Sequence, residues 1–377
     1  MDVGGTAVIE VGEPEIVVPS PGLPGDSAPL AANNNLDACR RDGCTYLAWR
    51  TAPTHFASRR ARLEVVAEEA PGRWRHETTV RLGRDVREPR FVVHDGRLLL
   101  YFFTAGVHPL RFEPDRIQLT ERLPDGTWSP PRPVSAPDRV VWRVRPVDGR
   151  LVMSGYVDAS GAYTTDRAPR TRFWSSGDGE HWEPMFDPGT FEPGTTETDF
   201  VVHDDGYLVV SRRESRGQGL GSVLAVLDGS GTVLRSRHEP RKFDSPALFD
   251  WHDRTFLVTR RQVLFGGRAA VVPPPVPDGW RDIANQLVYW ATPKATAVYE
   301  IDRASLEVRH VRDLPGCADT AFASIVGGGD DGSVTVYNYS SPFWMGLAPW
   351  IAGQVLPTRI HRVRLSWRPP AQVPGGG

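Results

Sequence analysis

A two-strand unit that recurs along the chain limits the possible folds more than any other feature of the sequence. In its clearest copy, residues 88–94 form an apolar strand with a charged start, Asp95-Gly96 form a turn, and residues 98–103 are apolar without alternation. An Asp-Gly pair between two apolar runs is typical of a β-hairpin. An apolar run without alternation predicts a strand that is buried on both faces.

Six copies of this unit follow one another with a period of about 50 residues, which is typical of solenoids and propellers. Their predicted turns are Asp42-Gly43, Asp95-Gly96, Asp148-Gly149, Asp205-Gly206, His252-Asp253 and Asp331-Gly332. Each unit also carries a second hairpin, and two hairpins make the four-stranded blade of a propeller. The sequence therefore predicts an all-β fold, a six-bladed β-propeller of four-stranded antiparallel blades, and no long amphipathic helix.

The repeats extend over almost the whole chain, so we expect a single propeller domain over residues 1–377. Residues 1–30 are predicted to supply a closing strand and a linker, with the closing strand paired beside residues 359–367 in the last blade. Residues 265–286 interrupt the period and predict an insertion, either a surface loop or a lid over the axis. Residues 369–377 are predicted to be a flexible tail.

Composition narrows the expected partners. The 377 residues carry a formal net charge of −2, which indicates neither a nucleic-acid partner nor a membrane partner. The N-terminal residues do not resemble a signal peptide and no apolar run is long enough to span a bilayer, so a cytoplasmic location is expected. The three cysteines lack the spacing of a metal site, and no metal or cofactor is predicted. No pattern indicates an oligomeric state.

Polar residues at the ends of the buried strands are expected to converge at one mouth of the propeller axis. The candidates are Asp37, Glu88, Arg90, Arg143, Glu197, Asp199 and Asp319, with Arg50, His55, Arg213, Arg260, Tyr337 and Tyr339 on neighbouring strand ends. One interpretation is structural, because charged groups beside buried strands are costly unless they are paired. The other is a pocket in which two acidic groups hydrolyse a glycosidic bond and arginines bind a substrate carboxylate.

One hairpin resembles a known family. Residues 176–182, Ser-Gly-Asp-Gly-Glu-His-Trp, look like the Asp-box hairpin of sialidases, one residue shorter than usual between Asp and Trp. Residues 319–322 and 337–341 are similar to the last blade of bacterial sialidase-like proteins. The resemblance is diffuse and extends from about residue 33 to residue 367.

The resemblance implies a retaining glycoside hydrolase with a tyrosine nucleophile, a glutamate that activates the tyrosine, an aspartate as acid/base and three arginines around a carboxylate. Carried over to this chain, these roles fall to Tyr339 or Tyr337, to Glu197, to Asp37 or Asp85, and to Arg50, Arg213 and Arg260. The first blade lacks the Arg-Ile-Pro motif of true sialidases.

Two alternatives remain open. Arg87-Glu88-Pro89 before a strand, a turn and an aromatic-rich strand is similar to arabinanase- and xylosidase-type hydrolases, which use three carboxylates. Those would be Asp37, Glu88 and either Glu197 or Asp199, although that family has five blades. The other alternative is a non-catalytic propeller that binds a ligand or protein at its axial mouth. The expected partner of the enzyme is a carbohydrate or glycoconjugate.

Overall fold

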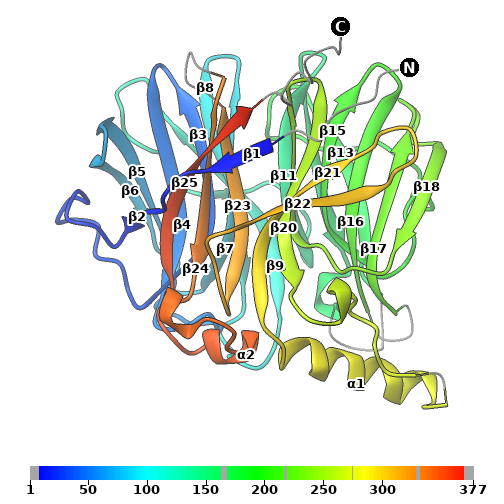
Figure 1. Ribbon diagram of the computed structural model, residues 1–377. Helices are drawn as coiled ribbons and strands as arrows, with labels where there is room; N and C mark the ends of the chain where they lie inside the picture. The colour runs from blue at the N-terminus through cyan, green and yellow to red at the C-terminus, as the bar shows by residue number, and fades with distance from the viewer. Residues whose placement is uncertain (1–7, 163–167, 216–218, 274, 328–331, 369–377) are drawn as a thin grey trace, which may run out of the picture.

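The computed structural model describes residues 8–162, 168–215, 219–273, 275–327 and 332–368. Six antiparallel sheets stand around a central axis, so the predicted six-bladed propeller is confirmed (Figure 1). Neighbouring innermost strands contact one another around the whole ring, and the last blade contacts the first. The predicted tail, residues 369–377, and Asp331 of the sixth predicted turn lie outside the described residues.

In each blade the first strand lies at the axis and later strands lie farther out. The first blade consists of β3 (Ala32–Arg41), β4 (Cys44–Ala52), β5 (Arg62–Ala70) and β6 (Arg73–Val80). The second consists of β7 (Asp85–His94), β8 (Arg97–Ala105), β9 (Pro114–Arg122) and β10 (Arg132–Pro133). The third consists of β11 (Arg139–Val147), β12 (Arg150–Val157), β13 (Arg170–Ser176) and β14 (Glu183–Pro184).

The fourth blade consists of β15 (Thr195–His203), β16 (Gly206–Ser215), β17 (Gly219–Leu227) and β18 (Val233–Glu239). The fifth consists of β19 (Asp244–Trp251), β20 (Arg254–Gln262), β21 (Lys294–Ile301) and β22 (Val308–Leu314). The sixth consists of β23 (Thr320–Gly327), β24 (Val334–Ser340), β25 (Arg359–Arg368), β1 (Val8–Val11) and β2 (Glu15–Val18).

The second strand of each blade forms the core between neighbouring blades. In β8, every residue from Leu98 to Phe103 is fully buried, as the lack of alternation predicts. Leu98 and Leu100 pack on side chains of the first blade, whereas Leu99 and Tyr101 pack on side chains of the third. Because successive side chains of a strand point to opposite faces, one apolar strand joins two interblade contacts.

The N-terminal segment closes the ring, as predicted from the sequence. Both β1 and β2 pair antiparallel with β25, so two segments from opposite ends of the chain complete one sheet (Figure 1). The exposed Ile16 is followed by Val17 and Val18, which are buried against the core of the first and sixth blades. Arg362 of β25 adds an ion pair with Glu15 at 2.9 Å.

The insertion contains helical elements that the sequence analysis did not predict, within a fold that is otherwise the predicted all-β propeller. It contains a short η2 turn (Phe265–Gly267) and a 13-residue helix, α1 (Asp278–Trp290). A second short helix, α2 (Trp350–Gly353), follows η3 (Phe343–Met345), and the remaining turn is η1 (Ala159–Gly161). Both α1 and α2 lie at the same end of the propeller (Figure 1). The prediction missed α1 because the three consecutive prolines at residues 273–275, just before the helix, favour a loop. None of the described helices is long and apolar enough to cross a membrane.

The hairpin at residues 176–182 fastens the third blade to the second. Asp178 Oδ1 accepts hydrogen bonds from the amides of Glu180 and His181, both at 2.8 Å, which fixes the turn. These bonds hold the pKa of Asp178 below its usual range. Tyr101 of the second blade donates its hydroxyl to the Gly179 carbonyl at 2.6 Å. The hydrogen bonds of this hairpin therefore stabilise its turn and join the third blade to the second.

The closing strand provides a test of the fold. Replacing the buried Val17 by Asp is expected to lower the free energy of unfolding by about 3 kcal/mol, because an unpaired carboxylate would enter an apolar core. The neighbouring Ile16→Asp places the same charge in solvent and is expected to change it by no more than about 0.5 kcal/mol. Urea denaturation measures both values, and equal midpoints for the two variants would contradict the closure.

Candidate functional site

An irregularity in each innermost strand turns side chains toward the axis. All six inner strands contain a register shift of the β-bulge type near the start of the strand. In five of them the extra residue has a positive φ, and these residues are Asn35, Glu88, Glu197, Ser245 and Phe322. A non-glycine residue in this conformation costs about 1–3 kcal/mol and tends to occur at functional sites. In the third blade the extra residue is the buried Trp142.

The five strained residues share one cavity of about 430 Å³ at the axis. The ionisable side chains that line it include Glu88, Glu197, Arg212, Glu214, Lys242, Asp244 and Arg260. The loops above contribute His55, Leu110, Tyr289 and Trp290 from the end of α1, and Trp350 from α2. The bulges therefore explain why one cavity collects polar groups from most of the blades.

Glu88 is the least satisfied carboxyl group of the site. Its side chain is 6% exposed, and its Oε2 atom has no hydrogen-bond partner among the described residues. Burial and the nearby Glu197 raise the pKa of Glu88 to about 8. The group is therefore protonated at neutral pH, and it can donate a proton into the cavity.

Glu197 is held differently. Its Oε1 lies 2.8 Å from Arg212 Nη1, and its Oε2 accepts the Ser245 amide at 2.7 Å. Burial raises the pKa of Glu197, while Arg212 and the amide oppose that rise. Both direct contacts favour the carboxylate, so of the two glutamates Glu88 keeps its proton and Glu197 is the better anion.

A compact ion-pair network forms one wall of the cavity. Arg212 contacts Glu214 at 2.8 Å and Asp244 at 3.4 Å, and Lys242 contacts the same two carboxylates at 2.7 and 3.3 Å. Burial alone raises the pKa of Asp244, but Lys242, Arg212 and Arg260 hold it below its usual range. This wall consists of charges that the protein itself neutralises.

The predicted nucleophile Tyr339 lies behind the cavity wall. Its fully buried hydroxyl donates to Asp319 at 2.8 Å and accepts from Arg260 at 3.2 Å. Asp319 in turn lies 2.7 Å from Nδ1 of His55, which does line the cavity. Burial and Asp319 raise the pKa of Tyr339 well above its usual value. The predicted Tyr339–Glu197 pair is therefore replaced by a Tyr339–Asp319–His55 chain.

Several other candidates are not brought to this cavity. The second candidate tyrosine, Tyr337, is buried in the core of the first and sixth blades, 3.5 Å from Arg362. Asp37 accepts the Phe91 amide at 2.8 Å and the Ser324 hydroxyl at 2.7 Å. Asp37 thus ties the sixth, first and second blades together instead of facing Glu88.

The predicted arginine clamp is divided. Arg260 reaches the cavity, but Arg50 is buried 2.9 Å from Asp85. Arg213 points to the other side of its strand, where Glu192 lies 3.8 Å away. Arginines that line the cavity in addition to Arg260 are Arg87, Arg111 and Arg212.

The remaining candidates form interblade contacts around the axis. Arg143 lies 3.1 Å from Asp199, and Arg145 reaches the same carboxylate at 3.2 Å. Arg90 stacks on Trp142, with 4.8 Å between its guanidinium carbon and the ring centroid. These residues therefore form ion pairs and a stacking contact between blades, which is the structural role considered for them in the sequence analysis.

Sequence reasoning missed the aromatic groups above the cavity. Tyr289 of α1 lies between the only two lysines of the chain, with Lys242 and Lys294 Nζ atoms 4.3 and 4.0 Å from its ring centroid. Its hydroxyl hydrogen-bonds Asp244. Lys294 also donates to the Thr292 carbonyl at 2.9 Å, just beyond the end of α1. The rarity of lysine was the available signal, because the two lysine side chains hold α1 over the site.

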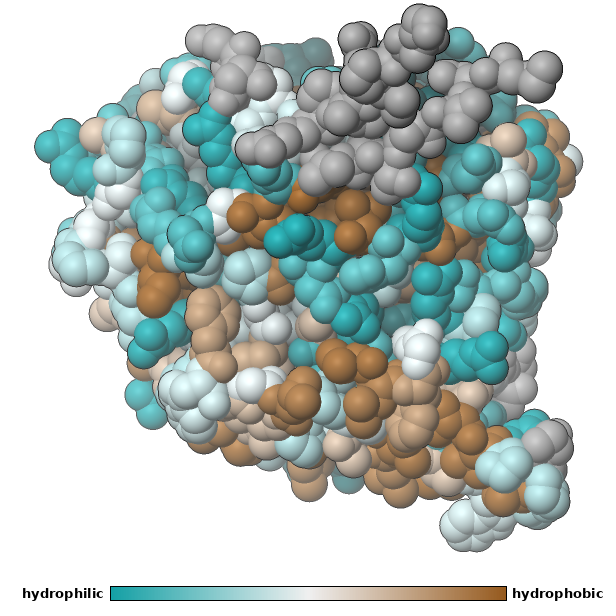
Figure 2. Space-filling model, in the orientation of Figure 1, coloured by the Kyte–Doolittle hydropathy of each residue, from teal (hydrophilic) through white to brown (hydrophobic). Residues whose placement is uncertain are grey.

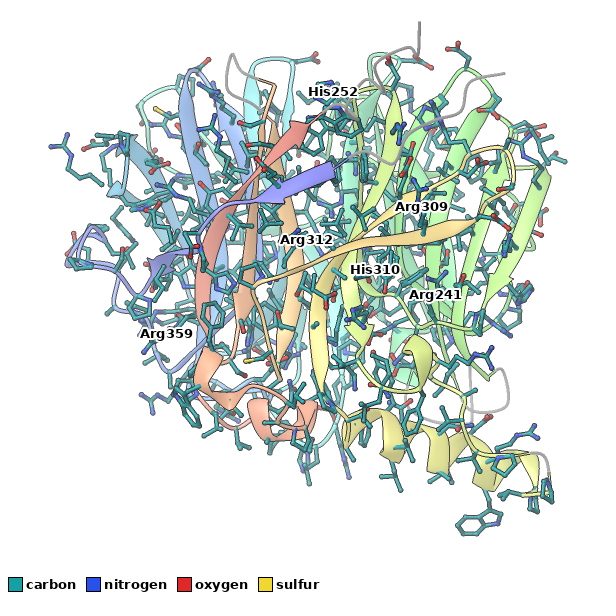
Figure 3. The ribbon with its side chains drawn as sticks, in the orientation of Figure 1. Arg241, His252, Arg309, His310, Arg312 and Arg359 are labelled. Carbon is teal, nitrogen blue, oxygen red and sulfur yellow. The ribbon has the colours of Figure 1, made fainter. Side chains whose placement is uncertain are left out.

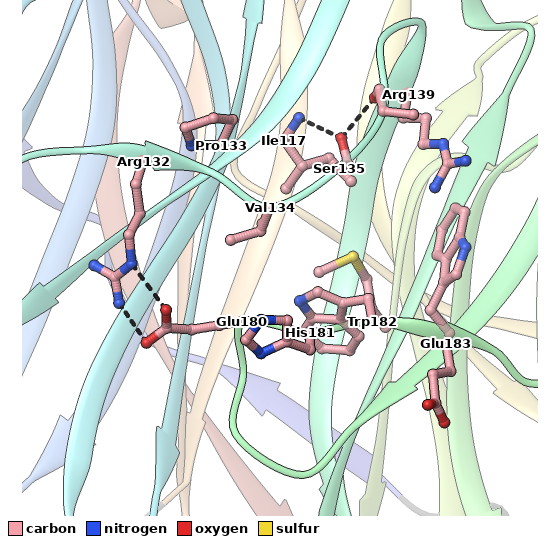
Figure 4. A pocket seen from close by; sticks show the side chains of 13 residues that line it. Ile117, Arg132, Pro133, Val134, Ser135, Arg139, Glu180, His181, Trp182 and Glu183 are labelled. Carbon is pink, nitrogen blue, oxygen red and sulfur yellow. Dashed lines mark hydrogen bonds and ion pairs between the residues drawn. The ribbon is translucent and has the colours of Figure 1, made fainter.

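A second pocket, of about 520 Å³, lies between β10 and the hairpin that follows β13 (Figure 4). Two of its charged groups pair with each other, since Arg132 lies 2.8 Å from Glu180. None of the non-glycine residues with a positive φ lines this pocket, so the axial cavity is the better candidate site. No cluster of side chains able to hold a metal ion occurs within the described residues.

Comparison with solved structures identifies the architecture. The phage phi92 endosialidase superposes with a TM-score of 0.58 at 10% identity, over 90% of this chain and 68% of that one. Trypanosoma rangeli sialidase, in complex with 2,3-difluorosialic acid, superposes with a TM-score of 0.62 at 11% identity, over 95% and 59%.

The chain has the six-bladed fold of the sialidases. The resemblance seen in the sequence is therefore confirmed as a likeness of fold. No protein-family model and no curated protein matches the sequence. This sialidase-like propeller spans little more than half the length of the trypanosomal sialidase.

The protonation of Glu88 can be measured through stability. Between pH 4.5 and about 8 the folded protein holds a proton that the unfolded chain releases, so stability is greatest below this window and falls across it. The slope is about 1.4 kcal/mol per pH unit for one proton. Glu88→Gln has no such proton, so its free energy of unfolding relative to wild type is expected to rise by a few kcal/mol from pH 5 to 8.

Chemical denaturation across this pH range measures the difference. The matched control is Glu13→Gln, at an exposed glutamate far along the chain from the cavity, which is expected to follow wild type. If the free energies of unfolding of Glu88→Gln and wild type differ by the same amount at every pH, Glu88 is ionised across this range and the prediction is wrong.

Proposed function

We propose that this sialidase-like propeller is a glycoside hydrolase that acts on a glycan or glycoconjugate through Glu88 and Glu197. The observation that carries the proposal is a pair of glutamates in one cavity, both on strained bulges, of which one is protonated and one is ion-paired. Two carboxyl groups in opposite protonation states are what glycosidic cleavage requires. Glu88 would protonate the departing oxygen, and Glu197 would act on the opposite side as base or nucleophile.

The assignment favours carboxylate chemistry over a tyrosine nucleophile. Tyr339 has no exposed surface, and its hydroxyl is already committed to Asp319 and Arg260. A nucleophile must reach the anomeric carbon from the cavity, which Glu197 can do and Tyr339 in this arrangement cannot.

The nature of the sugar remains a prediction. Three of the arginines that line the cavity already have carboxylate partners: Arg87 with Asp85 at 2.7 Å, Arg212 with Glu197 at 2.8 Å and Arg260 with Asp244 at 3.5 Å. An acidic sugar would have to compete with these partners, whereas a neutral sugar would not. The substrate panel therefore includes aryl sialosides, hexuronides and arabinosides.

Leaving-group dependence tests the role of Glu88. With a poor leaving group such as an alkyl alcohol, Glu88→Gln is expected to lower kcat/KM by about 10²–10⁴-fold, because the departing oxygen needs a proton. With a dinitrophenyl glycoside, whose leaving group needs no proton, the loss is expected to be less than about tenfold. Glu197→Gln is the matched comparison and should lose activity on both substrates. Equal losses for Glu88→Gln on both would remove Glu88 as the acid.

The pH profile gives a second readout of the same group. Wild-type kcat/KM is expected to fall above pH of about 8, where Glu88 loses its proton. Glu88→Gln should lack this basic limb in its residual activity on the dinitrophenyl glycoside. Failure of wild type to cleave any glycoside in the panel would instead favour the non-catalytic ligand-binding propeller.

Tyr339→Phe separates the two mechanisms. Removing the hydroxyl leaves Asp319 paired with His55, so we expect activity to stay within about tenfold of wild type. A loss of about 10³-fold or more with unchanged thermal stability would restore the tyrosine nucleophile predicted from the sialidase resemblance.

A further inference from the structure

Helix α1 turns its polar side toward the protein and its apolar side toward solvent. On the inner side Asn285 Oδ1 accepts the amides of Val271 and Val272, both at 2.8 Å, and Gln286 donates to Glu214 at 3.2 Å. On the outer side Trp280 is 70% exposed and Leu287 is 56% exposed. A helix on a soluble protein normally buries its apolar stripe, so this orientation leaves an apolar face without a partner among the described residues.

A second exposed apolar segment lies beside it. Residues 342–358 contain no charged residue, yet Trp344 is 79% exposed and Leu347 is 73% exposed, and Val355 is also exposed. Figure 1 places α1 and α2 at the same end of the propeller, and Figure 2 shows apolar surface along that end. The two segments meet where the rings of Trp290 and Trp350 lie 6.4 Å apart.

Together these side chains form an apolar surface at the cavity end of the propeller. We define the apolar rim as Leu110, Trp280, Leu287, Trp344, Leu347 and Val355, all of them exposed. Leu110, Trp290 and Trp350 connect the rim to the cavity, because they belong to its lining. The apolar surface is therefore continuous with the cavity lining at these three residues.

The charges at the edge of the rim suggest what it contacts. Arg111 lies next to Leu110, and Arg359 follows directly after the uncharged segment; both are exposed (Figure 3 labels Arg359). An uncharged apolar centre with exposed tryptophans and peripheral arginines complements the acyl region and phosphate groups of a lipid surface. The net charge of −2 describes the whole chain and does not reveal this local pattern.

We propose that the face formed by the apolar rim docks on the surface of a lipid bilayer, with the axial cavity open toward the headgroups. A lipid surface is favoured over a protein partner or a second copy because the centre of the rim is uncharged and exposes tryptophans, with arginines at its edge. A bilayer that contains glycolipids would also present sugars to the cavity. This last step rests on the proposed function, whereas the docking itself depends only on the rim.

Vesicle flotation tests the docking independently of catalysis. Wild type is expected to float with phosphatidylcholine vesicles, with or without phosphatidylserine. The double variant Trp344→Glu/Leu347→Glu is expected to bind at least about tenfold more weakly, since two anchoring side chains are lost. Leu234→Glu is the matched control, because Leu234 is exposed on β18, away from the rim, and should bind as wild type does.

Three outcomes decide the proposal. Weaker binding of the double variant, with Leu234→Glu and the thermal midpoints unchanged, supports it. Absence of wild-type binding to both vesicle types overturns it. Concentration-dependent dimerisation of wild type that the double variant abolishes, without vesicle binding, also overturns it in favour of self-association. Turnover of soluble aryl glycosides is measured in parallel, so that an inactive protein that still binds vesicles refutes only the proposed function.

Discussion

The bulge near the start of each inner strand is the constraint on which the rest of the site depends. A regular strand would send alternate side chains into the two neighbouring blades, as β8 does, and none would point down the axis. The extra residue, held at positive φ in five blades, breaks that alternation and aims Glu88 and Glu197 into a shared cavity. The surrounding sheets supply the stability that keeps these strained conformations in place.

Once several charged groups are brought to one axis, the protein has to neutralise them. Most pair with each other: Arg143 and Arg145 with Asp199, Arg50 with Asp85, and Arg212 with Glu197. Glu88 is the exception, since one of its oxygens has no partner and its proton replaces a counter-ion. The structural interpretation of the charged set therefore describes the paired residues, whereas the functional interpretation stays a prediction for Glu88.

The loops at the cavity end differ from the blades in which side chains they bury. In the blades apolar side chains face inward, whereas α1 buries Asn285 and Tyr289 and exposes Trp280. Fixing Tyr289 between two lysines positions the helix over the site and leaves its apolar stripe outward. The same arrangement therefore completes the cavity and creates the apolar rim.

Local patterns in the sequence were sufficient for the fold. The Asp-Gly turns and the unbroken apolar run of residues 98–103 predict hairpins and doubly buried strands, and their repetition predicts six blades. The site depended on tertiary structure, because a strand end does not reveal which way a bulge turns its side chain. Asp37 and Glu88 occupy equivalent stretches of sequence, yet one ties three blades together and the other faces the cavity. Likewise, the burial of Tyr339 and the outward stripe of α1 depend on neighbours distant in sequence, which no local pattern encodes.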